Sequence, residues 1–188
     1  MLFNLLVSPE DAVHNMSWGD PGFGGFIILL LANVSVVSGL AIFPGLPYTV
    51  FVYAMTWGLL ARLVMLGGII MLLGCMYHFS AELLDGKGLG KYFIKALPYG
   101  FAPFCLAAPI ALILKAFAGK ITGWLLFLIF SVILLVWAAQ LQVEIISRFY
   151  RLTGRDSLTV FVLPWIIGFL VLTGAFVFFL IGIIISAI

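Results

Sequence analysis

The stretch ITGWLLFLIFSVILLVWAAQLQV, residues Ile121–Val143, carries no charged side chain and decides the fold. One helical crossing of the hydrocarbon core of a bilayer needs roughly 20 mostly apolar residues, so this stretch predicts a transmembrane helix. The sequence contains four further stretches of this kind, which are Phe23–Phe43, Leu63–Ala81, Ala96–Leu114 and Thr159–Ile188. We therefore expect an all-α integral membrane protein in which residues 23–188 form a bundle of five transmembrane helices.

The composition supports the same class of protein. Hydrophobic residues make up 65% of the chain and charged residues only 9%, whereas about a quarter of a soluble domain is charged. The net charge of +2 is small and scattered, and a nucleic-acid partner needs a dense basic face. The lipid bilayer is therefore the expected surrounding, and nucleic acid is not an expected partner.

Residues 1–22 form a separate N-terminal segment. The run SPED at residues 8–11 supplies an N-cap, a proline at the first helical position and acidic residues in the first turn. Val13 and Met16 share one helical face and Trp18 follows, which predicts a short amphipathic helix lying in the interface. Because the segment contains no Lys or Arg, we do not expect a cleaved secretory signal.

The third predicted span contains three prolines, Pro98, Pro103 and Pro109. Each proline removes a backbone donor and clashes with the preceding turn, so this helix is expected to be kinked or broken. A bilayer tolerates freed backbone groups only where the protein or a wet cavity satisfies them. The segment is therefore expected to face neighbouring helices. A bent packing helix is the preferred interpretation, and a gated pathway is the alternative.

Small residues recur along the fifth predicted span. They fall roughly on one helical face and predict close packing against another helix. An internal contact and an oligomer interface both fit this pattern, and we favour the internal contact. The residues are Gly168, Ala175, Gly182 and Ser186.

Basic residues in the loops predict the orientation, because cytoplasmic loops carry an excess of Lys and Arg. With five spans, one side holds Lys87, Lys91, Lys95, Arg148, Arg151 and Arg155, and the other holds Arg62, Lys115 and Lys120. We therefore expect a cytoplasmic N-terminus and a C-terminus outside.

Arg62 leaves the start of the second span open. In the preferred interpretation, its side chain snorkels at the surface and the span starts after it. In the other, the helix starts near Tyr53 and the bundle encloses Arg62.

A polar stripe at the end of the fourth span is the clearest candidate for binding. Gln140, Glu144 and Arg148 follow one another at intervals of four residues, with the acid before the base as an ion pair prefers. Gln142 and Arg151 widen this polar end. The stripe is either a site for a partner or ligand, or a plain helix end where charges emerge into the headgroups.

Lys87 and Lys91 belong to the glycine-rich loop LLDGKGLGKYF, residues 83–93. The loop lacks the spacing of a nucleotide-binding motif. We expect it to contact anionic headgroups or a partner protein.

No residues suggest catalysis. His78 and Glu82 share a helix face with the spacing of metal ligands, but two ligands do not complete a site. The sequence has no metalloprotease or nucleophile-elbow motif. We predict a non-enzymatic protein without metal or cofactor, in which Cys75 and Cys105 are free thiols. A lipid-active enzyme would need His78, Glu82 and Glu144 to converge on one pocket.

Four segments together resemble the Yip1-domain family. They are LLVSPEDAV (5–13), LLDGKGLGKYF (83–93), ALPYGFAPFCLAAPIALI (96–113) and QLQVEIISRFYRLTGRDSLTVFVLP (140–164). The resemblance implies a five-helix membrane protein with a cytoplasmic N-terminus. Eukaryotic relatives act in vesicle traffic between endoplasmic reticulum and Golgi, where they associate with lipid-modified small GTPases.

This chain has neither the long N-terminal region nor the Asp-Leu-Tyr-Gly-Pro motif of the trafficking members, which favours a prokaryotic plasma-membrane protein. The expected function is that of a membrane scaffold, adaptor or accessory subunit that binds a membrane or cytoplasmic protein, with self-association open. The alternative is a transport component, such as an exporter subunit or small carrier, with a path along the third helix.

Overall fold

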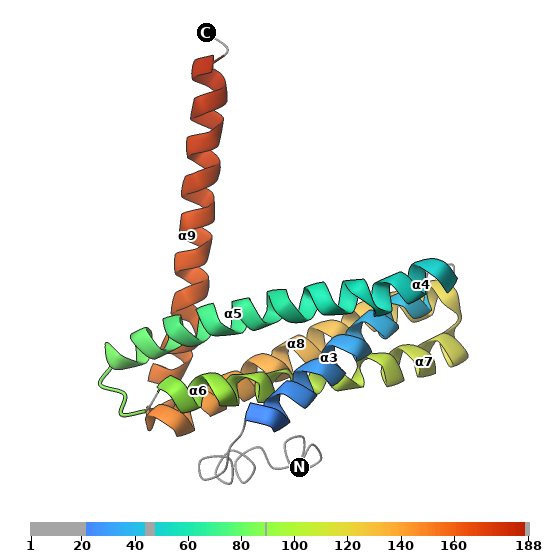
Figure 1. The fold of residues 1–188 in the computed structure, drawn as a ribbon, viewed down its shortest axis with the longest axis horizontal. Coiled ribbons are helices and arrows are strands. Elements are labelled where there is room, and N and C mark those ends of the chain that lie inside the picture. The colour runs from blue at the N-terminus through green and yellow to red at the C-terminus, as the bar shows by residue number, and fades with distance from the viewer. Residues whose placement is uncertain (1–21, 44–47, 89, 187–188) are drawn as a thin grey trace.

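The computed structural model describes residues 22–43, 48–88 and 90–186, and in these ranges the chain is helical with short turns and no strand. Figure 1 shows the arrangement of the helices. They are α3 (Gly22–Ile42), α4 (Tyr48–Met55), α5 (Trp57–Glu82), α6 (Gly90–Ala96), the 3₁₀ helix η1 (Leu97–Leu106), α7 (Ala107–Ala118), α8 (Lys120–Tyr150) and α9 (Gly154–Ser186). The predicted interfacial helix falls in residues 1–21, which lie outside the described residues.

The prediction of five helices long and apolar enough to cross a membrane is confirmed. Their boundaries are Phe23–Ile42, Thr49–Glu82, Tyr92–Ala118, Lys120–Tyr150 and Gly154–Phe179. The second, third and fourth run further than predicted. Arg62 does not interrupt the second, and the polar end of the fourth stays helical up to Tyr150.

Most of the helices lie side by side along one axis (Figure 1). Helix α3 packs against η1 and α7, and α8 runs back along α7 and η1. Gly119 makes the turn into α8 with φ 74°, a conformation that side-chain-bearing residues rarely adopt.

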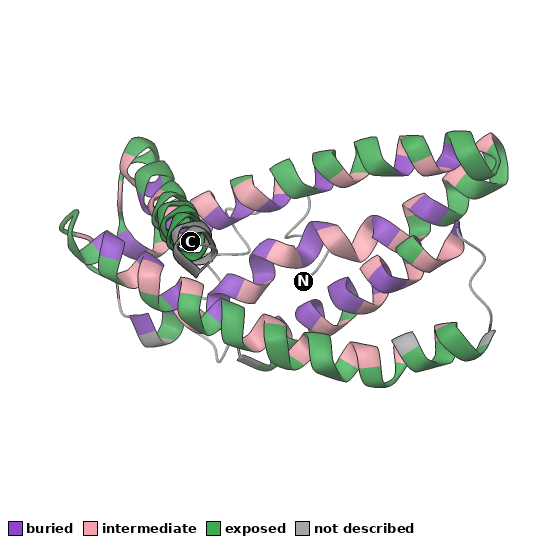
Figure 2. Cartoon of the chain, turned by 90° about the horizontal axis from the view of Figure 1, so that it is seen from above, coloured by how far each residue is buried: buried purple, intermediate pink, exposed green. Residues whose placement is uncertain are grey.

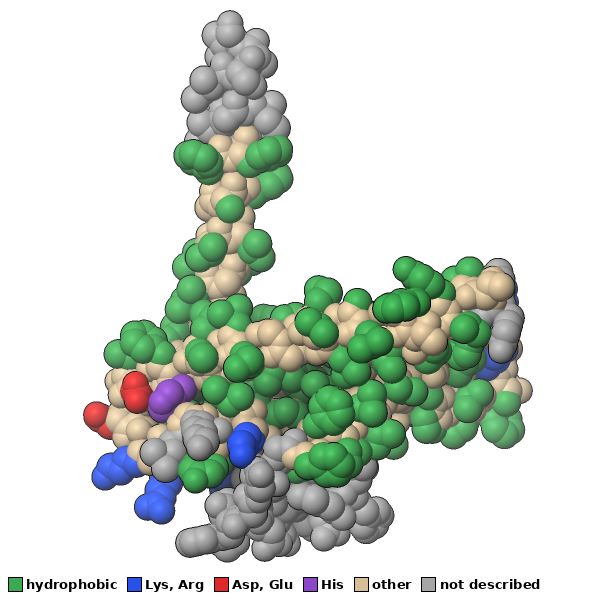
Figure 3. All heavy atoms as spheres, in the orientation of Figure 1, with side chains coloured by type: hydrophobic (Ala, Val, Ile, Leu, Met, Phe, Trp, Pro, Cys, Tyr) green, Lys and Arg blue, Asp and Glu red, His purple; other side chains and the backbone are tan. Residues whose placement is uncertain are grey.

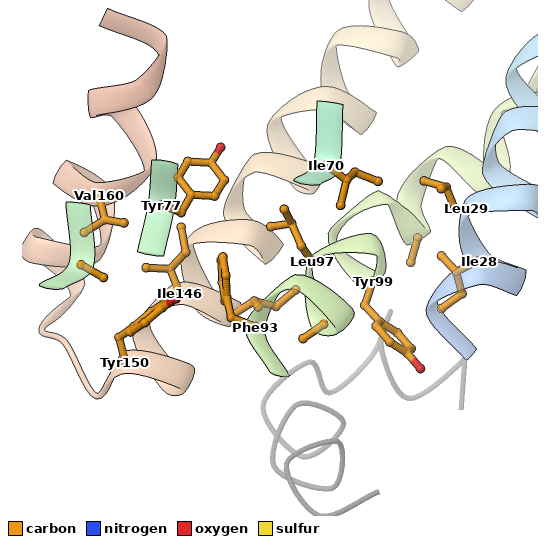
Figure 4. Packing of buried hydrophobic residues seen from close by; sticks show 14 residues of the cluster. Ile28, Leu29, Ile70, Tyr77, Phe93, Leu97, Tyr99, Ile146, Tyr150 and Val160 are labelled. Carbon is orange, nitrogen blue, oxygen red and sulfur yellow. The ribbon is translucent and has the colours of Figure 1, made fainter. Parts of the chain in front are cut away.

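Two apolar clusters fill the interior. The larger one joins α3, α5, α6, η1, α8 and the first turns of α9, and its rings include Tyr77, Phe93 and Tyr150 (Figure 4). The smaller one lies near the α7–α8 turn and is built around Phe43 and Phe127. Beside the smaller cluster, Lys115 Nζ donates a hydrogen bond to the Ile42 carbonyl at 2.7 Å. This bond satisfies a free carbonyl at the C-terminus of α3.

The proline-rich segment changes helix type. Residues 97–106 form a 3₁₀ helix with Pro98 at its start and Pro103 inside, and Pro109 falls in the first turn of α7. The segment is enclosed by α3 and α8, since Leu97, Tyr99, Gly100, Ala102 and Pro103 are buried. A bend of this span in the membrane stays a prediction.

Ser35 of α3 satisfies backbone groups beside these prolines. Its Oγ donates to the Cys105 carbonyl at 2.8 Å and accepts a hydrogen bond from the Ala108 N–H at 2.8 Å. In a regular α-helix the Cys105 carbonyl would accept from residue 109, but Pro109 has no N–H. One hydroxyl therefore supplies the partner that the proline removed.

Helix α9 leaves the bundle at a steep angle (Figure 1). Its first turns pack against α5 and α8, where Val160 and Pro164 are buried and the Phe161 ring stacks on Tyr77 with centroids 6.0 Å apart. Beyond Gly168, every side chain from Phe169 to Phe179 is exposed. Figure 2 views α9 nearly end-on and shows exposed residues around the helix.

The predicted internal contact of the small-residue face does not form in the part of α9 whose surroundings are described. A Cβ built on Gly168 would meet nothing within 4 Å, and Ala175 is exposed. Gly182 and Ser186 belong to the helix, but their surroundings lie outside the described residues. An oligomer interface is the alternative that this leaves open.

Candidate functional site

Ionisable side chains gather at the end of the bundle where α5 leads into α6 (Figure 3). The Lys87 N–H donates to the Tyr150 carbonyl at 3.2 Å, so the 83–90 loop and the C-terminus of α8 meet at this end. We call it the polar end. Lys87 and Arg151 are both exposed there.

A row of three side chains connects the core to the surface of the polar end. The Tyr150 hydroxyl lies 3.0 Å from His78 Nδ1, and His78 Nε2 lies 3.4 Å from Glu82 Oε1. Tyr150 is 1% exposed, whereas Glu82 is exposed. An imidazole with its hydrogen on Nε2 suits both contacts, because Nδ1 then accepts from the tyrosine and Nε2 faces the carboxylate.

The glycines of the 83–90 loop allow the chain to approach this row. A Cβ on Gly88 would lie 2.6 Å from Tyr150 Cδ1, and one on Gly90 would lie 2.5 Å from His78 Cδ2. Gly86 donates its N–H to the Ala81 carbonyl at 2.8 Å and so caps α5. Packing thus explains the glycines of this loop. Nothing about the Lys91 side chain is described.

The predicted ion pair within the polar stripe is confirmed, since Arg148 Nε lies 2.7 Å from Glu144 Oε1. Gln140 is exposed beside Val136 and Trp137. The stripe lies on a solvent- or lipid-accessible face of α8, and a role for it in binding stays a prediction.

The prediction that Gln142 widens the polar end is wrong, because its side chain lies inside the bundle. It is buried, and a Cβ on Gly100 would lie 2.5 Å from its Cγ. Tyr150 was likewise missed as a partner of His78, because 72 residues separate them. A tyrosine at the exit of an apolar helix was the only sequence signal.

The described residues do not gather a metal site. Among them, no group of three or more His, Cys, Asp or Glu side chains could hold a metal ion. Glu144 pairs with Arg148, while Glu82 faces His78. Cys75 and Cys105 are free thiols, as predicted.

Two apolar pockets flank the proline-rich segment, and Phe101 and Phe104 line both. The first, of about 390 Å³, lies between α3, α5 and η1 and includes Asn33 and Arg62 in its wall. The second, of about 580 Å³, lies between α5, η1, α8 and the base of α9 and includes Gln142.

Arg62 fits neither sequence interpretation in full. Helix α5 begins before it at Trp57, and its side chain lines the first pocket but is exposed.

Comparison of the chain with protein-family models, with curated proteins and with solved structures finds no match. The resemblance to the Yip1-domain family therefore stays a prediction from the sequence.

Proposed function

We propose that this chain is a multi-pass protein of the plasma membrane of a prokaryote that acts as a non-enzymatic scaffold or accessory subunit. Five apolar helices support insertion into a bilayer. The proposal includes a cytoplasmic polar end, from the excess of basic residues there. The relationship to the Yip1-domain family is part of the proposal and rests on the sequence resemblance alone.

The exposed length of α9 is the observation that carries the proposal. The helix has 33 residues, which at 1.5 Å per residue is about 50 Å. Within the described residues, only its base packs against other helices. Helices in lipid associate where small side chains let backbones approach closely, and Gly168 and Ala175 offer such a face unoccupied. A partner helix would bind there.

Affinity purification from native membranes in mild detergent, followed by native mass spectrometry, tests this function. The double variant Gly168→Leu/Ala175→Leu fills the small-residue face, and we expect it to lose the partner that copurifies with the wild type. Val177→Leu enlarges a side chain on the opposite side of α9 and is the control. A wild-type protein that elutes alone, or a double variant that retains its partner, would contradict the proposal.

A transport component is the second candidate, because the two pockets lie on either side of η1. Their walls are almost entirely apolar, so a path there suits an apolar cargo better than an ion. Cys105, half-buried on η1, reports on water access in a Cys75→Ser background. Labelling by a charged thiol reagent would support a hydrated path, and complete protection would count against it.

A further inference from the structure

The pocket between α3, α5 and η1 combines an apolar wall with two polar groups. Most of its lining is hydrophobic, namely Leu29, Ala32, Val36, Met65, Leu66, Ile69, Phe101 and Phe104. Asn33 of α3 and Arg62 of α5 complete the lining. A pocket of this composition suits a ligand that is apolar over most of its length and polar at one end.

Asn33 is the first polar group. The side chain is only 7% exposed, and its Nδ2 makes no hydrogen bond within the described part of the chain. A buried amide without an acceptor is unfavourable. The amide nitrogen itself is closed to solvent, so an oxygen of a bound molecule would accept from it once the side chain turns into the pocket.

Arg62 is the second polar group. The residues that the structure describes contain ion pairs at His78–Glu82 and Glu144–Arg148 but none at Arg62. A guanidinium beside apolar helix surface is unfavourable without an anion, and a charged residue within an apolar helix is a candidate binding residue. Phosphate oxygens match its donors.

The order of these groups along the pocket defines the ligand. Helices α3 and α5 run in opposite directions (Figure 1), so Arg62 lies toward Val36 and Ile69 lies toward Leu29. Asn33 lies one helical turn before Val36 in α3. Along the pocket, a cation is thus followed by a hydrogen-bond donor and then by apolar side chains.

We propose that this pocket binds one phospholipid with an anionic headgroup. The phosphate pairs with Arg62, an ester carbonyl accepts from Asn33 Nδ2, and an acyl chain lies along Leu66, Ile69 and the two phenylalanines. The site rests on the proposed position in a membrane but not on the partner of α9.

Native mass spectrometry of the full chain in a mild detergent, with added dioleoyl-phosphatidylglycerol, tests the site. We expect one lipid bound per chain, with weaker binding of dioleoyl-phosphatidylcholine. Arg62→Gln should weaken phosphatidylglycerol binding roughly tenfold, the loss of one charge-assisted hydrogen-bonded pair. Lys87→Gln removes an exposed charge outside the pocket and should leave binding unchanged.

Two further variants keep the test decisive if Arg62→Gln folds poorly. Arg62→Lys retains the charge and should retain most of the binding. Asn33→Leu removes the unpaired amide, so it should weaken lipid binding while leaving the melting temperature of the lipid-free protein unchanged or higher. A lower melting temperature would assign Asn33 a purely structural role and overturn the proposal.

The remaining outcomes also decide the question. Equal losses of phosphatidylglycerol binding in Arg62→Gln and Lys87→Gln would show that the lipid is attracted by charge without a specific site. Preferential binding of oleate would show that the occupant is a fatty acid with a carboxylate. Either result overturns the proposal. Lipid binding that persists in Gly168→Leu/Ala175→Leu separates this site from the partner face of α9.

Discussion

At the scale of single residues, Ser35 shows how a hydroxyl on one helix makes a proline tolerable on another. Its Oγ bridges the Cys105 carbonyl and the Ala108 N–H. The sequence predicted that backbone groups freed by the prolines would find partners within the protein. It could not identify Ser35, because a contact between residues 70 positions apart leaves no local pattern.

Replacing Ser35 with alanine removes a hydrogen-bond partner from two half-buried backbone groups. We expect Ser35→Ala to lower the free energy of unfolding by about 1–3 kcal/mol. Ser131→Ala is the matched control, because Ser131 Oγ only bonds to the Phe127 carbonyl within its own helix. Thermal unfolding in detergent measures both variants, and equal effects would contradict the role given to Ser35.

The Glu144–Arg148 pair illustrates what a sequence does reveal at this scale. Its two residues are four apart on one helix, and that spacing alone places them together. The bond between His78 and Tyr150 depends instead on how α5 and α8 pack, so spacing gave no indication of it.

At the scale of secondary-structure elements, the three prolines predicted a disrupted third span, and the structure shows which disruption occurs. The backbone adopts 3₁₀ geometry over residues 97–106 and returns to α at Ala107. The sequence located the irregular segment but could not specify the helix type, which depends on how closely α3 and α8 enclose it.

Pro109 and Ser35 act on the same carbonyl and should therefore be coupled. In a Pro109→Ala background, the restored N–H can donate to the Cys105 carbonyl, so Ser35→Ala should cost less than in the wild type. A double-mutant cycle on unfolding free energies measures this, and we expect a coupling of about 0.5–1.5 kcal/mol. Strictly additive effects would show that the two residues act independently.

The 83–90 loop is the second element where packing explains an unusual sequence. Gly90→Ala would place a methyl group against the His78 ring, which stacks on Tyr150 with centroids 5.7 Å apart. We expect a loss of about 1–3 kcal/mol in unfolding free energy from this overpacking. Gly154→Ala faces open space and should be close to neutral in the same assay. Two equally stable variants would show that the loop is free to move away from His78.

At the scale of the whole molecule, the number of apolar helices followed from the sequence but the path of α9 did not. Apolar length indicates that a helix avoids water and says nothing about its neighbours, because lipid tails and helix surfaces are equally apolar. The small residues of α9 predicted a close contact. The described structure leaves Gly168 and Ala175 free of one within the chain.

The orientation of the whole molecule is the last prediction. The loop at Lys87 and the α8–α9 turn lie at one end of the bundle, joined by the bond from the Lys87 N–H to the Tyr150 carbonyl, while Lys115 lies beside the end of α3. We expect a cysteine at Asp85, in a Cys75→Ser/Cys105→Ser background, to be protected from membrane-impermeant reagents in intact cells. A cysteine at Lys120 should be labelled. The reverse result would invert the topology.

The isolation of α9 has a consequence for how its residues tolerate change. Between Phe169 and Phe179 the rest of the described chain places no steric demand on any side chain, so apolar substitutions there should be neutral for folding. A deep mutational scan of this segment, scored for growth and for protein level, would then separate two kinds of position. Positions where substitutions reduce growth without reducing the protein level would form the surface through which α9 contacts another molecule in the cell.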